Sequence, residues 1–516
     1  MTRRWLVLLP AALVLAAGIA FYLMPGADPA PEDPDARVRA ACSGCHVFPP
    51  ADILPRSAWR KQIEHMEGLL EYLPEEGGAP FSVDEAVEWY EARAPERLPV
   101  EPRLTREEPA PLRFRRRYAL LEPEGGPGIA TVTRLEGFPL PGFNPSLASA
   151  HMMNGSIHLF SLQQGPRWVG EVGHAARIST GDLDGDGLED LVVSDLGSPM
   201  PTDELVGRVV VGRNVGDGSF EWEVIADGIG RVSDARPIDL DADGDLDVAV
   251  ASFGWLRSGG AYVLRNETVS PGPLDFQVEQ VSARPGAVSV VPVYDLEPGP
   301  GFAVAFSQHH ELVSVFHATG EGFEERILYR APHPNWGTSN LEAVDLDGDS
   351  DTDFLLSHGD TLDDGIAFKP YHGVEWLENR DGEFHPQRIG ALYGAHAAVA
   401  ADLDGDGDQD VIASGFLPQV QLPVPEGGMR VDSVIWFERR GDAWIPWSVG
   451  MDLPRHTGMT VVDVNEDGRL DVVAGINTAW DVSARQDGPA LAIWFNEGPR
   501  EPDSPALRDR LRPTQP

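Results

Sequence analysis

The sequence predicts a mainly β chain in which a seven-bladed β-propeller follows a small all-α domain and an N-terminal apolar helix. Three observations predict this: an aspartate-rich segment that recurs five times between residues 182 and 471, a Cys-x-x-Cys-His motif at 42–46, and an uncharged apolar run at 5–24. The expected organisation is a signal peptide or signal anchor at 1–25, a linker at 26–35, the all-α domain at 36–93, a proline-rich linker at 94–112, the propeller at 113–500 and a flexible tail at 501–516.

The composition limits the classes of protein to consider. The chain has 516 residues, with 82 Asp and Glu against 40 Lys and Arg and a formal net charge of −42. We expect no nucleic-acid partner, because binding to phosphate backbones depends on Lys and Arg. The hydrophobic content of 42% is sufficient for packed cores, so the charge does not indicate disorder. Two cysteines cannot form a disulfide scaffold.

The first 25 residues predict the compartment. Arg3 and Arg4 precede the apolar run from Trp5 to Met24. A helix of this length extends about 30 Å, enough to cross a bilayer core, whereas the apolar part of a cleaved signal peptide is usually shorter. The run favours a retained anchor, with cleavage after it as the alternative. Because flanking arginines stay in the cytoplasm, we expect a periplasmic or extracytoplasmic protein, anchored to the inner membrane or secreted.

Both cysteines lie in one motif, Cys42-Ser43-Gly44-Cys45-His46. Two thiols at this spacing reach the two vinyl groups of a haem, and the adjacent imidazole becomes an axial iron ligand. A thioredoxin-like dithiol would require a βαβ setting, and a zinc site would require a second pair of ligands. The sequence supports neither alternative, so we expect one covalently bound haem c.

The second axial ligand is expected on a helix predicted from Ser57 to Leu70. Met66 lies on the apolar face of that helix, and a thioether there would suit a haem pocket and raise the haem potential. Its neighbour His65 is the rival ligand, and Met66 could also be an ordinary core residue. A capping box at 82–85 predicts a last helix from Val83 to Arg93. So small a domain needs haem to supply much of its core.

Residues 36–93 resemble the short cytochrome c modules of exported bacterial proteins. The matching features after the haem motif are Phe48-Pro49, Leu54-Pro55, the helix with Trp59 and Met66, and the closing Trp89-Tyr90. The resemblance supports Cys42, Cys45, His46 and Met66 as the haem-binding residues.

The rest of the chain repeats itself. The first aspartates of the five segments, at 182, 239, 345, 402 and 463, are separated by 57, 106, 57 and 61 residues. The double interval predicts a missing member near Asp295, where the outline remains with fewer carboxylates. One period before the first segment, residues 122–130 have the same eroded outline. We therefore expect seven units between residues 110 and 510.

Each unit has the pattern of a propeller blade. One β run leads into the aspartate segment, another leaves it, and later aromatic strands such as Val374–Asn379 follow. About four strands in each unit are typical of a blade, and closure of seven blades into a ring would protect the sheet edges. An open solenoid is the alternative, but it should have capped end units, and none is visible.

The aspartate segments predict sites for a hard cation. Oxygens at positions 1, 3, 5 and 9 and a backbone carbonyl at position 7 can surround Ca²⁺, and a glycine at position 6 allows the sharp turn. The third segment has Ser350 at position 6, which leaves its turn open. Position 12, a Glu in EF-hands, is apolar in all five segments, so an EF-hand is rejected. The alternative is an aspartate-rich turn that binds nothing, at the cost of repulsion between carboxylates.

These segments resemble the FG-GAP repeats, also grouped with VCBS repeats, of integrin-like β-propellers, and the likeness extends over nearly all of 110–510. The resemblance implies up to five Ca²⁺ ions, with none at the two eroded units. The implied ligands are Asp182, Asp184, Asp186, Asp190, Asp239, Asp241, Asp243, Asp247, Asp345, Asp347, Asp349, Asp353, Asp402, Asp404, Asp406, Asp410, Asp463, Asn465, Asp467 and Asp471.

Histidines recur at the strand ends opposite to the predicted cation sites. They could bind a metal, a substrate or the haem domain, or they could be polar residues that line a water-filled channel. The catalytic residues are unknown, and the candidate face contains His174, His309, His310, His358, His396 and His456.

Two functions from different classes follow. The first is an exported haem c electron-transfer protein whose calcium-stabilised propeller binds a redox partner protein or a small-molecule or glycan ligand, with oxidoreductase activity left open. The second is a non-catalytic, adhesion-like docking propeller tethered to a cytochrome. A fold that hosts many functions does not choose between them.

Overall fold

The computed structural model describes residues 33–44, 46–70, 82–101, 103–121, 131–139, 146–269, 273–320, 322–362, 365–418, 431–479 and 488–500. The predicted signal segment at 1–25, Cys45 and the tail at 501–516 lie outside the described residues. Within the described ranges, no helix has the length and apolar character needed to cross a membrane.

A small group of helices precedes the strands. The described part of this region contains α2 (Pro34–Cys42), α3 (Trp59–Leu70) and α4 (Val83–Arg93), with two 3-10 turns, η1 (Ala51–Ile53) and η2 (Arg56–Ala58). The helices expected at 57–70 and 83–93 are therefore present, and the Ser82 hydroxyl caps α4 as the capping box predicts. The Trp59 and Tyr90 rings stack with centroids 3.8 Å apart and join α3 to α4. Helix α2 was not expected, because only Val38 in it is buried.

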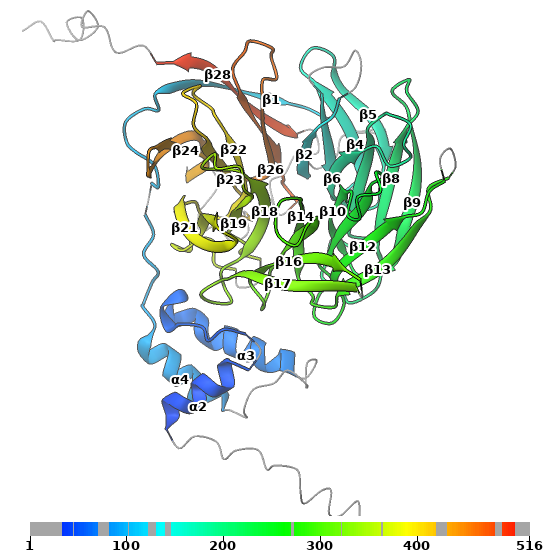
Figure 1. Cartoon of the computed structure of the whole chain (residues 1–516). Coiled ribbons are helices and arrows are strands. Elements are labelled where there is room, and N and C mark those ends of the chain that lie inside the picture. The colour runs from blue at the N-terminus through cyan, green and yellow to red at the C-terminus, as the bar shows by residue number, and fades with distance from the viewer. Residues whose placement is uncertain are drawn as a thin grey trace, which may run out of the picture.

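Seven four-stranded antiparallel sheets follow, and they confirm the seven-bladed β-propeller (Figure 1). The first three blades contain β2 (Val132–Gly137), β3 (Leu147–His151), β4 (Ser156–Ser161) and β5 (Gly165–Glu171), then β6 (Ala175–Gly181), β7 (Asp190–Asp195), β8 (Gly207–Asn214) and β9 (Phe220–Ile229), then β10 (Val232–Ile238), β11 (Asp247–Ser252), β12 (Gly260–Asn266) and β13 (Phe276–Ser282). The next three contain β14 (Ala287–Val293), β15 (Gly301–Phe306), β16 (Leu312–Thr319) and β17 (Gly322–Arg330), then β18 (Thr338–Val344), β19 (Asp353–His358), β20 (Gly373–Arg380) and β21 (Glu383–Ala391), then β22 (Ala395–Ala401), β23 (Asp410–Gly415), β24 (Val431–Arg440) and β25 (Ala443–Asp452).

The seventh blade closes the ring with strands from both ends of the propeller. It contains β26 (His456–Val462), β27 (Asp471–Ile476) and β28 (Leu491–Pro499), and the early strand β1 (Leu112–Ala119) pairs antiparallel with β28. This closure corrects one expectation. The strand before 122–130 is β1, which belongs to the seventh blade, and the first blade begins at β2, after that segment. Residues 122–130 themselves lie outside the described residues.

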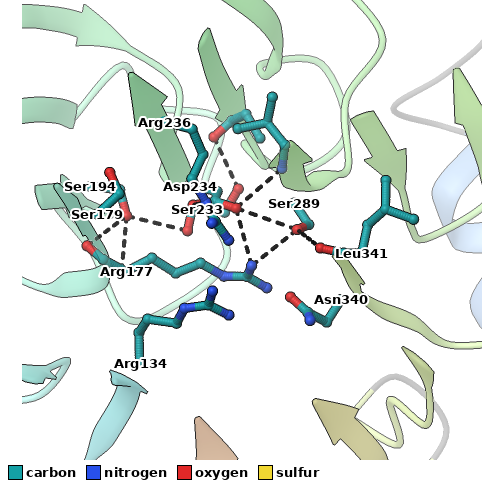
Figure 2. A network of polar contacts seen from close by, with 12 residues as sticks. Arg134, Arg177, Ser179, Ser194, Ser233, Asp234, Arg236, Ser289, Asn340 and Leu341 are labelled. Carbon is teal, nitrogen blue, oxygen red and sulfur yellow. Dashed lines mark hydrogen bonds and ion pairs between the residues drawn. The ribbon is translucent and has the colours of Figure 1, made fainter. Parts of the chain in front are cut away.

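The inner strands of the seven blades surround the axis, and four of them, β2, β6, β10 and β18, contain charged side chains. Strands β2, β6, β10, β14, β18, β22 and β26 contact one another in this order around the ring. Figure 2 shows the side chains that they contribute, among them Arg134, Arg177 and Asp234. Arg134 also pairs with Glu342 at 2.7 Å. The axis is therefore occupied by a buried network of ion pairs and hydrogen bonds.

The helices lie against the end of the propeller at which the inner strands begin (Figure 1). The Tyr371 hydroxyl donates to the Ile53 carbonyl oxygen at 3.3 Å, and Ile366 packs on the same helical core. The connecting segment is bound along the propeller as well. The Leu104 amide and the Thr105 hydroxyl both donate to the Asp432 carboxylate at 3.0 Å.

Candidate functional site

A cavity of about 350 Å³ lies between the helices and the propeller. Its volume is in the range of small-molecule and cofactor sites. Cys42, His46 and Met66, all selected from the sequence, line this one cavity, and so does the rival ligand His65. The structure thus brings the described haem-binding candidates to a shared space.

The helical wall of the cavity is mainly apolar. It includes Trp59, Ile63 and Leu69 from α3 and Tyr90 from α4. The Tyr90 hydroxyl donates to the Pro49 carbonyl oxygen at 3.1 Å and lies beside the Cys42 thiol, whose pKa is raised by burial. This wall leaves the Cys42 side chain half-buried.

The imidazole of His46 is held in a form suited to metal binding. Its Nδ1 lies 2.9 Å from the Val47 carbonyl oxygen, and an Nδ1–H that donates there leaves Nε2 as the available lone pair. Burial lowers the pKa of His46, so the ring is neutral at neutral pH. Met66 is half-buried, whereas His65 is exposed, which favours the thioether as the more enclosed of the two rival ligands.

The opposite wall comes from three blades and combines apolar and polar residues. The lining residues are Trp255 and Leu256 after β11, Ser307, Gln308, His309 and Glu311 after β15, Pro334, Asn335 and Gly337 before β18, and Asp360, Leu362 and Lys369 after β19. The Glu311 carboxylate is buried and accepts hydrogen bonds from the amides of Gly337 at 3.2 Å and Thr338 at 2.9 Å. Burial raises the pKa of Glu311 to about 8.

The loop that carries Glu311 has a strained backbone. Gln308 and Glu311 both have positive φ angles, of 58° and 42°. Such a conformation costs a non-glycine residue about 1–3 kcal/mol and is common at functional sites. His309 lies between them and lines the cavity, and its ring centroid is 4.0 Å from that of His310.

Buried histidines lie behind the propeller wall of the cavity. His358 stacks on Trp336 with centroids 4.2 Å apart, and His333 contacts the rings of Trp336 and Tyr371. Neither ring nitrogen of His358 or of His372 has a hydrogen-bond partner in the described protein. Burial lowers the pKa of each of these histidines. Sequence reasoning missed His333, although it precedes an inner strand as His174 does.

The six histidines of the predicted face do not form one site. Of these, only His309 is among the described residues that line the cavity. His310 contacts the His309 ring, whereas His174 and His396 make separate local contacts. The Nδ1 of His174 is 3.0 Å from the Met152 carbonyl oxygen, and the Nδ1 of His396 is 2.8 Å from the Thr457 carbonyl oxygen. His456 Nε2 lies 3.7 Å from the Asp452 carboxylate.

The aspartate loops lie at the opposite end of the propeller, where each joins an inner strand to the second strand of its blade. In four of them, three carboxylates each place an oxygen within 4.8 Å of the others. These sets are Asp182, Asp184 and Asp190, then Asp239, Asp241 and Asp243, then Asp345, Asp347 and Asp349, then Asp402, Asp404 and Asp406. Their chemistry is that of sites for a hard divalent cation. In the fifth loop, Asn465 replaces the second carboxylate.

Residues 182–250 match a family model described as FG-GAP-like repeat.

The matched span begins in the first aspartate loop and ends in β11, after the second loop. Comparison with curated proteins finds no match. Among solved structures, a crystal structure of BBS1N in complex with ARL6DN is similar at 11% identity, with a TM-score of 0.43, 75% of this chain covered and 99% of that chain. The N-terminal domain of Nup159 is similar at 11% identity, with a TM-score of 0.41, 76% of this chain covered and 97% of that chain.

The five aspartate loops, two of which lie in the matched span and which are called FG-GAP-like loops below for brevity, share one backbone conformation. Positions 4 and 6 have positive φ in all of them, at Gly185 and Gly187, Ala242 and Gly244, Gly348 and Ser350, Gly405 and Gly407, and Glu466 and Gly468. The turn at Ser350, which the sequence left open, is formed with a φ of 75°. The sequence did not predict the positive φ angle at position 4. Glycine occupies this position in three loops, but Ala242 and Glu466 occupy it in the other two, so no glycine pattern indicates the left-handed conformation.

The ninth residue of each FG-GAP-like loop also stabilises its blade. Asp190 is buried and accepts from the Leu183 amide at 3.0 Å and from the Asn214 amide at 2.8 Å. Asp353 and Asp410 make the same pair of contacts in their blades. In three of the four carboxylate sets this ninth residue is not among the converging oxygens, so its contacts tie the loop to the sheet.

Proposed function

We propose that this protein is an extracytoplasmic haem c electron-transfer protein, in which the cavity between the helices and the propeller holds the haem. The observation that carries the proposal is that Cys42, His46 and Met66 line that single cavity. The sequence indicates these side chains by their chemistry, their spacing and a family resemblance. Their presence in the lining of one cavity supports the haem reading of the Cys-x-x-Cys-His motif.

The donor set and the walls fit a haem. Cys42, with Cys45, would hold the macrocycle by thioether bonds, and His46 and Met66 would ligate the iron. The flat apolar ring would lie against a wall of Trp59, Ile63 and Tyr90 side chains. A haem with His and Met ligands supplies one-electron transfer at a raised potential. The chain's own contribution is a neutral His46 ring, a half-buried thiol and a second wall of the cavity on the propeller side.

The propeller would act as a calcium-stabilised support and as the surface for a partner. Up to five Ca²⁺ ions at the FG-GAP-like loops would offset part of the carboxylate charge. The acidic surface that remains suits a basic redox protein. The cavity could instead bind a small molecule or a glycan, and the protein would then be an oxidoreductase. The turnover and binding measurements described below distinguish this outcome from the binding of a partner protein.

The test is expression of the chain in a bacterial host that carries out cytochrome c maturation. We expect covalent haem, seen as one haem of added mass and as a c-type pyridine haemochrome spectrum. The double variant Cys42→Ser and Cys45→Ser should lose it, whereas Ser43→Ala in the same motif should keep it. Haem-free wild-type protein from a host that matures a control cytochrome would refute the proposal.

A docking propeller is the second candidate, and the FG-GAP-like match favours it independently of haem. Reduction of the haem by sugars, alcohols or small electron donors would support an enzyme. Tight binding of a protein or glycan without turnover, retained in the haem-free double variant, would support docking.

A further inference from the structure

The outermost strand of the seventh blade is strongly basic. Strand β1 contains four exposed arginines, Arg113, Arg115, Arg116 and Arg117, and no acidic residue. The chain as a whole has a formal net charge of −42. This concentration of positive charge on one exposed strand is the opposite of what the composition of the molecule would give, and it calls for a physical reason.

The outer strands of the other six blades lack this feature. They are β5, β9, β13, β17, β21 and β25, and in each of them the acidic residues equal or outnumber the arginines. Strand β9, for example, carries Glu221, Glu223 and Asp227 and no basic residue. Charged side chains on an edge strand can prevent unwanted pairing. Because six outer strands do without a row of arginines, protection of the edge does not explain the row on β1.

Only two of the four arginines are paired with carboxylates. The Arg115 guanidinium lies 2.8 Å from the Glu497 carboxylate of β28, with side chains that are 53% and 39% exposed, and Arg116 pairs with Asp452 of β25. Within the described part of the chain, the side chains of Arg113 and Arg117 make no ion pair and no hydrogen bond. Because exposed ion pairs contribute little to stability, Arg115 also remains available to another carboxylate.

The second edge of β1 is open. Strand β1 is the last strand of its sheet, and among the described strands it pairs only with β28. Its outward amide and carbonyl groups can therefore pair with an added strand, which is a common mode of peptide recognition. Arg113, Arg115 and Arg117 occupy alternate positions, which direct side chains to one face of a strand at intervals of about 7 Å. An added strand would thus meet a regular row of guanidinium groups.

The charge of β1 restricts what that strand can be. Opposite charges across a strand pair are stabilising and like charges are destabilising, so the arginines reject a basic strand and favour an acidic one. A long polyanion or an anionic membrane would also face the acidic remainder of the molecule, which repels it. A short acidic segment meets the arginines of β1 alone.

We propose that β1 is the docking strand for an extended acidic segment of a partner protein, which adds to the seventh blade as a fifth strand with carboxylates at alternate positions. This surface is separate from the cavity, because β1 lies on the side of the propeller far from the helices (Figure 1). The inference does not rest on haem, and it applies equally to the haem-loaded and the haem-free protein.

The test uses the full chain and a fluorescent peptide of the length of β1 in which Glu alternates with Thr. We expect saturable binding at low ionic strength, measured by fluorescence anisotropy, that weakens as salt is added. The double variant Arg113→Gln and Arg117→Gln, which removes no contact within the described chain, should bind roughly tenfold more weakly. The matched control, Arg167→Gln and Arg330→Gln, removes two exposed arginines of β5 and β17 and should bind as wild type does. Equal affinity of the Arg113, Arg117 variant and wild type, or no saturable binding to wild type, would overturn the inference.

Two further measurements test the strand pairing itself. Hydrogen exchange of the β1 amides should slow several-fold when the peptide is bound, whereas exchange in β9 should not change. The same peptide with N-methylated backbone amides keeps its charges but loses its N–H donors, and we expect it not to bind. Equal binding of the two peptides would overturn the inference. So would vesicles containing phosphatidylglycerol that bind wild type but not the Arg113, Arg117 variant while the peptide binds neither, a result that would assign β1 to an anionic lipid surface.

Discussion

The guanidinium of Arg177 lies 3.1 Å from the carboxylate of Asp234 at the axis of the propeller (Figure 2). Asp234 also accepts from the Val290 amide at 3.1 Å and lies 3.4 Å from the Arg236 guanidinium. Burial raises the pKa of Asp234, but the arginines beside it lower it more strongly, and the net pKa is below its usual value. Because a buried ion pair pays a desolvation cost, this carboxylate must stay charged and fully bonded to be tolerated.

We therefore predict that Asp234→Asn destabilises the propeller. The change removes the carboxylate that pairs with Arg177 and leaves Arg236 with Glu342, at 3.9 Å, as its remaining ion-pair partner. Breaking a buried pair in this way costs about 3–5 kcal/mol. Urea unfolding followed by tryptophan fluorescence measures the loss. The control is Asp227→Asn, because Asp227 is exposed on β9. Similar midpoints for the two variants would contradict the structural role of the axial network.

The repeat architecture could be predicted because its signals are local. The aspartate loops, the β runs around them and their spacing are all readable along the chain, and the structure confirms seven blades. The first blade was misplaced for a physical reason. Strand β1 pairs with β28, which lies at the other end of the propeller sequence. Nothing in the residues of β1 indicates so distant a partner.

The candidate site could be predicted only in part. Cys42, His46 and Met66 carry their chemistry in their side chains and spacing, so the sequence indicates them as candidates, and the structure places them in the lining of one cavity. The propeller wall depends on docking: Lys369, Glu311 and Asn335 come from different loops and meet only because the helices cover those blades. The axial ion pairs were missed similarly, since Arg177 and Asp234 lie on separate inner strands.

The rival haem ligands can be distinguished by substitution. We predict that Met66→Leu removes the sixth iron ligand and lowers the midpoint potential, because Met/His ligation raises it. His65→Leu should leave the potential unchanged, since His65 is exposed on α3 whereas Met66 is half-buried. Potentiometric titration measures the shift, and loss of the far-red absorption band of Met-ligated ferric haem provides a second signal. The opposite pattern, with the shift in His65→Leu, would assign the ligand to His65.

The third FG-GAP-like loop offers a stabilising substitution. Ser350 has a φ of 75°, a left-handed conformation that costs a residue with a Cβ about 1–2 kcal/mol. We predict that Ser350→Gly raises the free energy of unfolding by about 1 kcal/mol. Ser350→Ala is the matched control, because it keeps the Cβ and with it the strain. A gain of equal size in both variants would show that the hydroxyl, and not the backbone, is responsible.

Without calcium, the stability of the propeller should fall as the pH rises. In the calcium-free protein, burial and neighbouring carboxylates raise the pKa of Asp190 and Asp353 to about 6 and that of Asp410 to about 7. A group whose pKa is raised on folding contributes stability below its unfolded pKa, near 4, and loses that contribution as the pH rises through the folded value. Calcium-depleted protein should therefore have a lower Tm at pH 7.5 than at pH 5.

Addition of Ca²⁺ should reverse this trend, because coordination requires the ionised carboxylates. At a hundredfold excess over Kd, each site adds about 2.7 kcal/mol, and the increase in Tm should be larger at pH 7.5 than at pH 5. The double variant Asp182→Asn and Asp184→Asn should lose part of the increase, whereas Asp227→Asn should keep all of it. Equal Tm values with and without Ca²⁺ at pH 7.5 would show that the loops fold without a cation. The positive φ angles at positions 4 and 6 of the loops would then serve the turn itself and not the binding of a cation.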